Sequence, residues 1–295
     1  MHNQFRLSGN PMERRIGTKS PLKIFWLSVE GAVTEKQYFS GLSSCRRQLG
    51  INAVIDVETL ERKRKMGDST PEDVRELMDE FLATRSSSLE ALLTAADPHF
   101  LSEYSVEELT QYFEGTLVKA KRKKMQRDLE RLGINLKYLK YLRERSSEDD
   151  EFCLIIDRDQ HSHTIESINT CRSWCEKRNV HFYFTNPCFE FWLLLHFLDV
   201  DSICTEEEKQ DMLLNRKKSN RHSYVSKFLS DTITEITGNG QSKRVKMFEG
   251  LYMNRIDNAI ENASKCATSF PELMDSLGCS IPQLVILLRS EYTHD

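Results

Sequence analysis

The stretch Phe152-Cys153-Leu154-Ile155-Ile156-Asp157-Arg158-Asp159 decides the fold of this chain, because five apolar residues run directly into two carboxylates. A strand that is apolar on both faces needs cover on both sides, which a parallel α/β sheet provides, and ligands bind where such strands end. Two close carboxylates repel each other unless one is protonated or both bind a hard cation such as Mg²⁺. The alternative is that Asp157 caps the following helix and Asp159 is solvated.

A second apolar segment, residues 24–29, also ends in an acid. Glu30-Gly31 follows this segment directly, and Glu35 comes shortly afterwards on an expected helix that begins at residue 34. The sequence therefore predicts a second strand with a carboxylate at its carboxyl end.

A third segment combines an acid with an apolar helix. Residues 180–184 resemble a strand, and in the segment that follows Asn186 is expected to cap a helix with Pro187 at its first position. This helix carries Glu190 and His196 among aromatic and aliphatic residues. An ionised glutamate in such surroundings is costly unless it is paired, so an ion pair or a capping role stays open for Glu190 beside a role in a site.

Together these three segments resemble the RloB family of bacterial phage-defence proteins. The residues that carry the resemblance are Glu30-Gly31, Thr34-Glu35, Tyr38-Phe39, Asp157-Arg158-Asp159 with His161, and the run from Asn186 to Phe197. The similarity covers residues 22–60 and 150–200 well and the C-terminal region more loosely. Residues 84–145 match no element of the family.

The resemblance implies a Toprim-like domain, in which a glutamate after the first strand and an Asp-x-Asp after the third bind divalent metal for chemistry on phosphodiesters. Carried over, Glu30, Asp157 and Asp159 are the expected metal and catalytic ligands, and the expected cofactor is Mg²⁺ or Mn²⁺. Glu35 is then a supporting acid or the general base, and Glu190 a further ligand or an orienting group. His161 and His196 are expected to donate hydrogen bonds from behind the ligands.

The expected fold is α/β, with a Toprim-like Rossmannoid sheet of four parallel strands flanked by helices. In Toprim-like sheets the first and third strands are neighbours, so Glu30 and the two aspartates should face one cleft. The expected regions are a flexible arm at 1–21, a core at 22–84 and 146–200, a helical insertion at 85–145, and a helical C-terminal region at 201–295.

Basic residues gather in clusters although the net charge is −4. Between Lys119 and Arg131 there are seven basic and two acidic residues, and two smaller clusters begin at Arg216 and Lys243. Such clusters suit phosphate backbones, whereas the alternative for each is a solvated helix face. The expected nucleic-acid-binding residues are Lys119, Lys121, Arg122, Lys123, Lys124, Arg127, Lys243 and Lys246.

Composition narrows the class of protein. A hydrophobic content of 39% over 295 residues is enough for a large core, and no run approaches the roughly 20 apolar residues of a membrane span. The N-terminus does not resemble a secretory signal, and the eight cysteines are scattered, so we expect a cytoplasmic protein without disulfides.

These observations predict a metal-dependent endonuclease of anti-phage, abortive-infection defence that cleaves RNA, tRNA included, or DNA. The alternative is a non-catalytic nucleic-acid-binding or regulatory subunit that docks a partner ATPase, which the family resemblance places in a neighbouring gene. No phosphate-binding loop of the GxxxxGK[ST] type occurs in the chain, so ATP hydrolysis by the chain itself is not expected. The sequence leaves a homo-oligomer open.

Overall fold

The computed structural model describes residues 23–31, 33–52, 55–60, 70–86, 91, 93–94, 97–132, 145–219, 222–238 and 248–290. The chain divides into two compact units. The larger one comprises residues 23–78 and 149–295, and the described part of the smaller one lies within 79–148. The expected arm at 1–21 falls outside the described residues.

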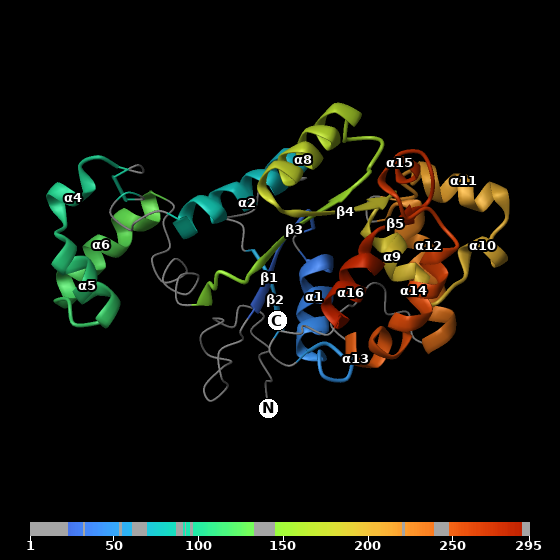
Figure 1. The fold of residues 1–295 in the computed structure, drawn as a ribbon, viewed down its shortest axis with the longest axis horizontal. Coiled ribbons are helices and arrows are strands. Elements are labelled where there is room, and N and C mark those ends of the chain that lie inside the picture. Colours follow the sequence, from blue (N-terminus) through green and yellow to red (C-terminus); the bar gives the residue numbers. More distant parts are fainter. Residues whose placement is uncertain are drawn as a thin grey trace. The chain divides into compact units, whose positions relative to one another are not determined.

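The larger unit is built on one five-stranded sheet in the order β2-β1-β3-β4-β5 (Figure 1). The strands are β1 (Lys23–Val29), β2 (Ile55–Thr59), β3 (Glu151–Asp157), β4 (His181–Asn186) and β5 (Gly278–Cys279). The first four are parallel, and β5 pairs antiparallel with β4. The predicted α/β class is confirmed, but the predicted count of four strands is wrong. The fifth strand has only two residues, too few for a periodic signal in the sequence.

The winding of the sheet changes direction beside β1. From β1 the chain passes through α1 (Thr34–Ser44) to β2 on one side, and it later returns to β3 on the other side of β1. The carboxyl ends of β1 and β3 therefore flank the point at which the strand order reverses. In open parallel sheets this is the place where ligands bind.

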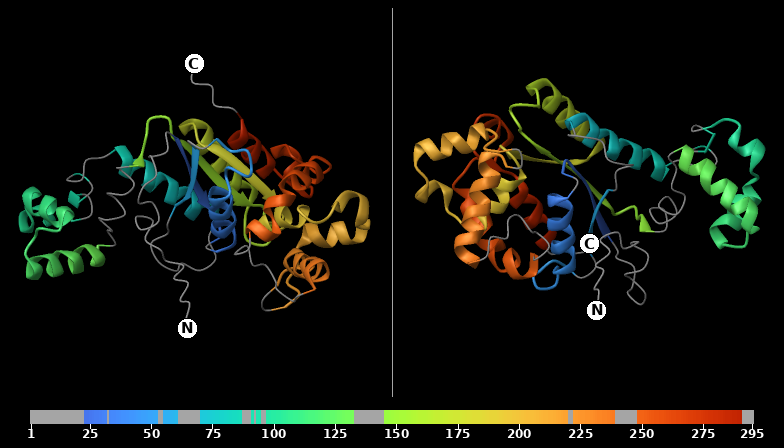
Figure 2. Two further views of the ribbon diagram at one scale, coloured as in Figure 1. Left: turned by 90° about the horizontal axis from the view of Figure 1, so that it is seen from below. Right: turned by 180° about the vertical axis from the view of Figure 1, so that it is seen from behind.

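Helices cover both faces of this sheet (Figure 1 and Figure 2). Phe25, Leu27 and Val29 point into a core that they share with α1, with α9 (Phe189–Leu195) and with C-terminal helices. On the opposite face, the Ser28 hydroxyl donates to the Val74 carbonyl of α2 (Pro71–Ser86) at 2.7 Å. The same face is covered by α8 (Ile165–Arg178), whose Thr164 side chain caps its first turn.

The C-terminal region is helical, as predicted. Its elements are α10 (Val200–Ile203), α11 (Glu206–Leu214), α12 (Tyr224–Thr237), α13 (Phe248–Leu251), a 3₁₀ turn at Met253–Arg255, α14 (Ile256–Ser264), α15 (Phe270–Leu273) and α16 (Ile281–Arg289). Helices α12 and α14 pack against α9, so this region completes the core around the third segment singled out in the sequence.

The smaller unit has a hydrophobic core of its own. Its helices are α4 (Phe100–Glu103), α5 (Val106–Glu114) and α6 (Lys119–Arg131). Ser105 and Glu108 form a reciprocal capping box at the start of α5, and Gly115 ends that helix in the left-handed conformation. Apolar side chains from all three helices pack together, among them Phe100, Leu109, Met125 and Leu129.

No helix among the described residues combines the length and the apolar character needed to cross a bilayer.

A buried carboxylate fastens β3 to β1 at the start of both strands. Asp150 accepts hydrogen bonds from the Ile24 backbone amide at 3.0 Å and from Trp26 Nε1 at 2.8 Å. Beside it, Glu151 accepts from Lys23 at 2.7 Å and faces His181 at 3.0 Å. The bond to His181 and the nearby Lys23 charge lower the pKa of Glu151 to about 2.

Asp150→Ala should destabilise the larger unit by about 2–4 kcal/mol, because each buried donor left without an acceptor costs about 1–3 kcal/mol. Urea unfolding followed by tryptophan fluorescence measures this effect, since Trp26, Trp174 and Trp192 all lie in the larger unit. The exposed neighbour Glu148 provides the control, Glu148→Ala, with an expected change below about 0.5 kcal/mol. Equal effects of the two substitutions would contradict the role of Asp150.

Candidate functional site

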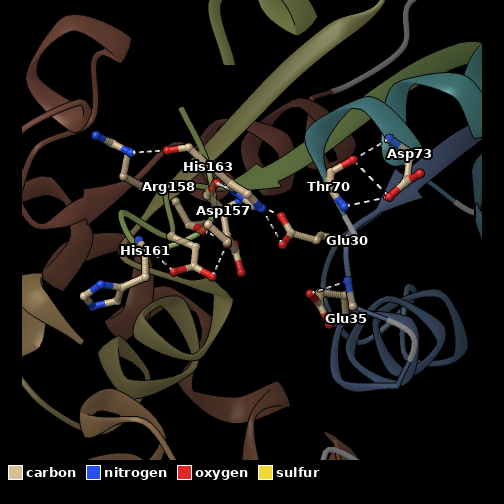
Figure 3. A network of polar contacts seen from close by, with 12 residues as sticks. Glu30, Glu35, Thr70, Asp73, Asp157, Arg158, His161 and His163 are labelled. Atoms are coloured by element: carbon tan, nitrogen blue, oxygen red, sulfur yellow. Dashed lines mark hydrogen bonds and ion pairs between the residues drawn. The ribbon is translucent and has the colours of Figure 1, made fainter. Parts of the chain in front are cut away.

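Two acids that are 127 residues apart in sequence meet at the carboxyl edge of the sheet. Glu30 directly follows β1, and Asp157 is the last residue of β3. The Asp157 backbone amide donates a hydrogen bond to Glu30 Oε2 at 3.2 Å. Figure 3 shows the Glu30 carboxylate directed toward the end of β3. The reversal point of the sheet therefore carries a pair of carboxylates.

The Asp157 carboxyl lies among other acids. Burial, followed by the charge of Glu35, raises its pKa well above the ordinary value, and the charge of Glu190 raises it further. A hydrogen bond from the Thr185 hydroxyl to Asp157 Oδ1 opposes the shift. The net upward direction means that the folded protein holds a proton here more tightly than a free aspartate does.

The pKa of Glu30 is raised in the same way. Burial and then the charge of Asp157 raise the pKa of Glu30 well above its ordinary value, with smaller contributions from Glu35 and Asp159. The hydrogen bond from the Asp157 amide opposes this rise. Because neighbouring acids raise both pKa values, a cation placed between these groups would relieve a strain that the fold itself creates.

Glu35 folds back over the turn that follows β1. Its side chain is 6% exposed, and its Oε1 accepts from the Gly31 backbone amide at 2.8 Å. A Cβ atom at Gly31 would overlap the Glu35 carboxyl group, so the close approach of this carboxylate requires glycine. Because residue 31 is glycine, the Glu35 carboxylate can lie against the backbone that directly follows Glu30.

Asp159 closes its own turn. Its Oδ2 accepts from the Ser162 hydroxyl at 2.6 Å and its Oδ1 from the His161 amide at 3.3 Å. The Asp159 amide donates to the Pro187 carbonyl at 3.1 Å, so the loop after β3 runs along the end of β4. The capping role that the sequence left open for Asp157 is filled by Thr164, whose side chain accepts from the Ser167 amide at the start of α8.

His163 is the base next to these acids, and sequence reasoning missed it. Its Nε2 lies 3.3 Å from Glu30 Oε1, and its Nδ1 donates to the Asp157 carbonyl at 2.9 Å. A carbonyl only accepts, so Nδ1 carries a proton and Nε2 faces Glu30 with a lone pair or a second proton. The two side chains form an ion pair only when His163 carries both ring protons. The alternating order Asp157, Asp159, His161, His163 gives no hint of which histidine turns inward.

The neighbouring arginine does not neutralise the cluster. Arg158 Nε donates to the Met274 carbonyl at 3.2 Å, and its Nη1 donates to the His163 carbonyl at 3.1 Å. Figure 3 shows its guanidinium turned toward the His163 backbone and away from Glu30. Both of its hydrogen bonds go to carbonyl groups, so Arg158 does not pair with the acids on either side of it.

The helix that carries Glu190 starts later than predicted. Asn186 is the last residue of β4, Pro187 precedes the helix, and Cys188 is the N-cap of α9 without a side-chain cap bond. Asn186 is still part of the strand, and its side-chain nitrogen donates to the Leu273 carbonyl at 2.7 Å. Glu190 lies in the first turn of α9, where its charge acts on Asp157.

His196 lies inside an aromatic cluster. Its Nε2 is 3.2 Å from the Tyr38 hydroxyl, its Nδ1 is 3.0 Å from the Trp192 carbonyl, and Tyr252 stacks edge-on against its ring. Burial lowers its pKa to about 3, so the ring is neutral at physiological pH. His196 therefore braces α1 against α9, the two helices that present Glu35 and Glu190.

The expected nucleic-acid-binding residues on α6 fall into two groups. Lys121 forms an ion pair with Glu108, Lys124 forms one with Glu103, and Arg122 lies over the Tyr112 ring. The exposed side chains Lys119, Lys123 and Arg127 form no ion pair with a described carboxylate. Lys243 and Lys246 lie outside the described residues.

The donor set fits a hard divalent cation. Carboxylate oxygens are the ligands that Mg²⁺ and Mn²⁺ prefer, and Mg²⁺ is usually held by one or two carboxylates, with waters and substrate phosphates completing its shell. Among the described residues, no three acidic, cysteine or histidine side chains are close enough to enclose an ion by themselves. Glu30 and Asp157 supply two carboxylates, which is enough protein ligands for a Mg²⁺ site that waters and substrate phosphates complete.

Asp157→Asn should raise the melting temperature of the metal-free protein at pH 8 by about 2–4 °C, or about 1 kcal/mol. A raised pKa in the folded state means that stability is fully present below the ordinary carboxyl pKa and is lost as pH rises through the folded pKa. The uncharged amide of asparagine does not ionise, so the variant does not lose this stability as the pH rises. Mn²⁺ should raise the melting temperature of the unsubstituted protein and raise that of the variant less.

Differential scanning fluorimetry at pH 5 and pH 8, in EDTA and in Mn²⁺, makes both comparisons. The control is Asp275→Asn, which removes an exposed carboxylate from the same unit. Destabilisation by Asp157→Asn at pH 8, or an equal Mn²⁺ effect on both variants, would contradict the electrostatic account.

No curated protein matches this chain, and no solved structure matches it. A family model described as RloB-like protein matches residues 25–288. The match includes the sheet except for Lys23 and Ile24, both acids of the central pair, and the helical C-terminal region up to the end of α16. The chain belongs to the RloB-like protein family.

Proposed function

We propose that this chain is a metal-dependent nuclease that hydrolyses phosphodiester bonds in RNA, tRNA included, or in DNA. Membership of the RloB-like family suggests a role in defence, and the proposal places that role in anti-phage defence. The observation that supports a nuclease is that Glu30 and Asp157 meet where the strand order of a parallel sheet reverses. The charges of Glu35 and Glu190 raise the pKa of Asp157 there.

The order of the acids supports a Toprim-like site. Such sites have a glutamate after the first strand and an Asp-x-Asp after the third, and here β1 and β3 are direct neighbours in the sheet. Glu30 and Asp157 are then the ligands of Mg²⁺ or Mn²⁺. Asp159 can join them only by giving up its hydrogen bonds to Ser162 and His161.

Each group around the pair has a separate task in this proposal. When bound, the divalent ion offsets the negative charge of the scissile phosphate and lowers the pKa of water. His163 Nε2 faces Glu30 Oε1 and so fixes the orientation of that carboxyl group. Glu35 is held by the Gly31 amide and keeps the turn after β1 in place.

Glu190 is the proposed general base. It is more exposed than Glu35, and it lies near enough to Asp157 for their charges to interact. In the reaction a water oxygen bonds to phosphorus, Glu190 accepts the proton of that water, and the ester P–O bond breaks. The leaving oxygen takes a proton from solvent, so the products are a phosphomonoester and an alcohol.

The smaller unit contributes affinity for nucleic acid in this proposal. Lys119, Lys123 and Arg127 are exposed on α6, whereas Lys121 and Lys124 are held by glutamates of the same unit. A partner ATPase belongs to the alternative, in which the chain is a regulatory subunit without catalytic activity of its own.

Cleavage assays test the nuclease directly. The purified chain is incubated with total tRNA, single-stranded RNA or plasmid DNA in EDTA, Mg²⁺ or Mn²⁺. Metal-dependent cleavage is expected, with a loss of at least about 100-fold in Asp157→Asn and in Glu30→Gln, because losing even a group behind a ligand costs about 10–100-fold.

Asp275→Asn serves as the matched control and should cleave as the unsubstituted protein does. Cleavage that persists in EDTA or in Asp157→Asn would show that these acids are not the catalytic centre. Binding of nucleic acid without cleavage in any condition would favour the alternative, a binding or regulatory subunit.

A further inference from the structure

We infer that Arg216 and Lys217, in the turn between α11 and α12, hold the phosphate backbone of the substrate next to the acid cluster. This inference deepens the proposed function and rests on it for the nature of the substrate. It arises from the way the turn is fastened to the loop after β3 and to the N-terminus of α9.

The first attachment joins the turn to the loop that carries Asp159. His161 Nε2 lies 2.8 Å from the carbonyl oxygen of Leu214, the last residue of α11. His161 is two residues from Asp159, and Leu214 is two residues from Arg216. The side chain that the sequence singled out as a donor behind the ligands is therefore a link between the acidic loop and the basic turn.

The second attachment joins the turn to the helix that carries Glu190. Asn215 Nδ2 donates to Cys188 Sγ at 3.5 Å, and Asn215 Oδ1 accepts from the Val225 amide at 3.0 Å. Cys188 is the N-cap of α9, and burial and the charges of Glu190 and Asp157 raise the pKa of its thiol. Asn215 therefore contacts a group that itself lies against the acid cluster.

Asn215 also sets the direction of the turn. Its φ of 42° is left-handed, a conformation that asparagine adopts more readily than most residues, and it ends α11 there. Arg216 comes next, and its Cα is about 3.8 Å from that of Asn215. The backbone thus delivers a basic residue immediately after the residue that touches Cys188.

Backbone pairing holds the described part of the turn in place. The Tyr224 amide donates to the Arg216 carbonyl at 3.0 Å, and Lys217 and Ser223 form an isolated antiparallel bridge. The positions of Arg216 and Lys217 are therefore tied to the start of α12.

The cations of this turn differ in what they contact. Lys218 lies 4.6 Å from the centre of the Tyr224 ring and 3.9 Å from Asp211. Arg216 and Lys217 are exposed, and neither forms an ion pair with any carboxylate among the described residues. The turn that carries these two cations is thus tied to the loop after β3 and to the start of α9, and no described carboxylate neutralises either cation.

Binding of a phosphodiester chain needs both acids that hold a metal ion and cations that are free to contact phosphates. Carboxylates alone repel a polyanion, and a metal ion between them attracts only the phosphate at the centre. Arginine and lysine nearby can hold the adjoining phosphates, and the planar guanidinium matches two phosphate oxygens at once. Binding the flanking phosphates would set the register of the scissile bond over Glu30 and Asp157.

The test measures binding separately from cleavage. Arg216→Ala with Lys217→Ala is compared with Arg47→Ala with Lys177→Ala, which removes the same charge from exposed positions in the turn after α1 and in α8 of the same unit. Full-length proteins are titrated in EDTA with a fluorescent single-stranded RNA of mixed sequence and with the same sequence as duplex DNA, at several salt concentrations.

Two lost phosphate contacts should reduce the slope of log K against log salt by about 1.4 for the single strand or about 1.8 for the duplex, from about 0.7 and 0.9 per contact. The probe whose slope falls by the amount expected for its own strand type identifies the substrate class. The control pair should keep the slope of the unsubstituted protein. His161→Ala, which frees the turn from the acidic loop, should keep the slope but reduce cleavage.

An unchanged slope in the Arg216 and Lys217 variant, or no binding of either probe by the unsubstituted chain, would overturn the inference. Cleavage that persists with an unchanged slope would leave the nuclease standing and remove only this site. A reduced slope in a protein that cleaves nothing would support the cationic site and overturn the proposed catalysis instead.

Discussion

The repulsion among carboxylates at one edge of the sheet is the constraint on which the rest of this structure depends. Glu30 and Asp157 are brought together by the pairing of β1 with β3, and burial and neighbouring acids raise the pKa of each. The opposite edge of the same strands is balanced, because Lys23 and His181 lower the pKa of Glu151 to about 2. Ion pairing thus lowers a carboxyl pKa where these strands begin, whereas burial and neighbouring acids raise two carboxyl pKa values where the strands end.

Much of the larger unit serves to hold these acids against their mutual repulsion. Glu35 is fixed by the Gly31 amide, and α1 is braced against α9 through Tyr38 and His196. The C-terminal helices pack on α9, so the core of the unit reaches directly beneath Glu190. A charge cluster of this kind persists only when packing around it is extensive enough to outweigh its cost.

Two elements carry the exposed cations that the proposals assign to nucleic acid. The smaller unit presents Lys119, Lys123 and Arg127 on a helix stabilised by its own core, and the turn after α11 presents Arg216 and Lys217. Arg158, the cation closest in sequence to both aspartates, is engaged with backbone carbonyls. Cations that do not neutralise the acids leave both kinds of charge available, the acids for a metal ion and the bases for phosphates.

Local patterns in the sequence determined strands β1, β3 and β4, the helix start at Thr34, the basic residues of α6 and the acids at the strand ends, because apolar runs and caps depend on neighbouring residues alone. Tertiary structure decided the rest. β5 exists only because residues 278–279 meet β4, Asn186 stays in β4 with its side chain bonded to the Leu273 carbonyl, and His163 faces Glu30 while His161 reaches Leu214. These partners lie 53 to 133 residues away in the sequence, and a one-dimensional pattern carries no information about which of them a side chain will meet.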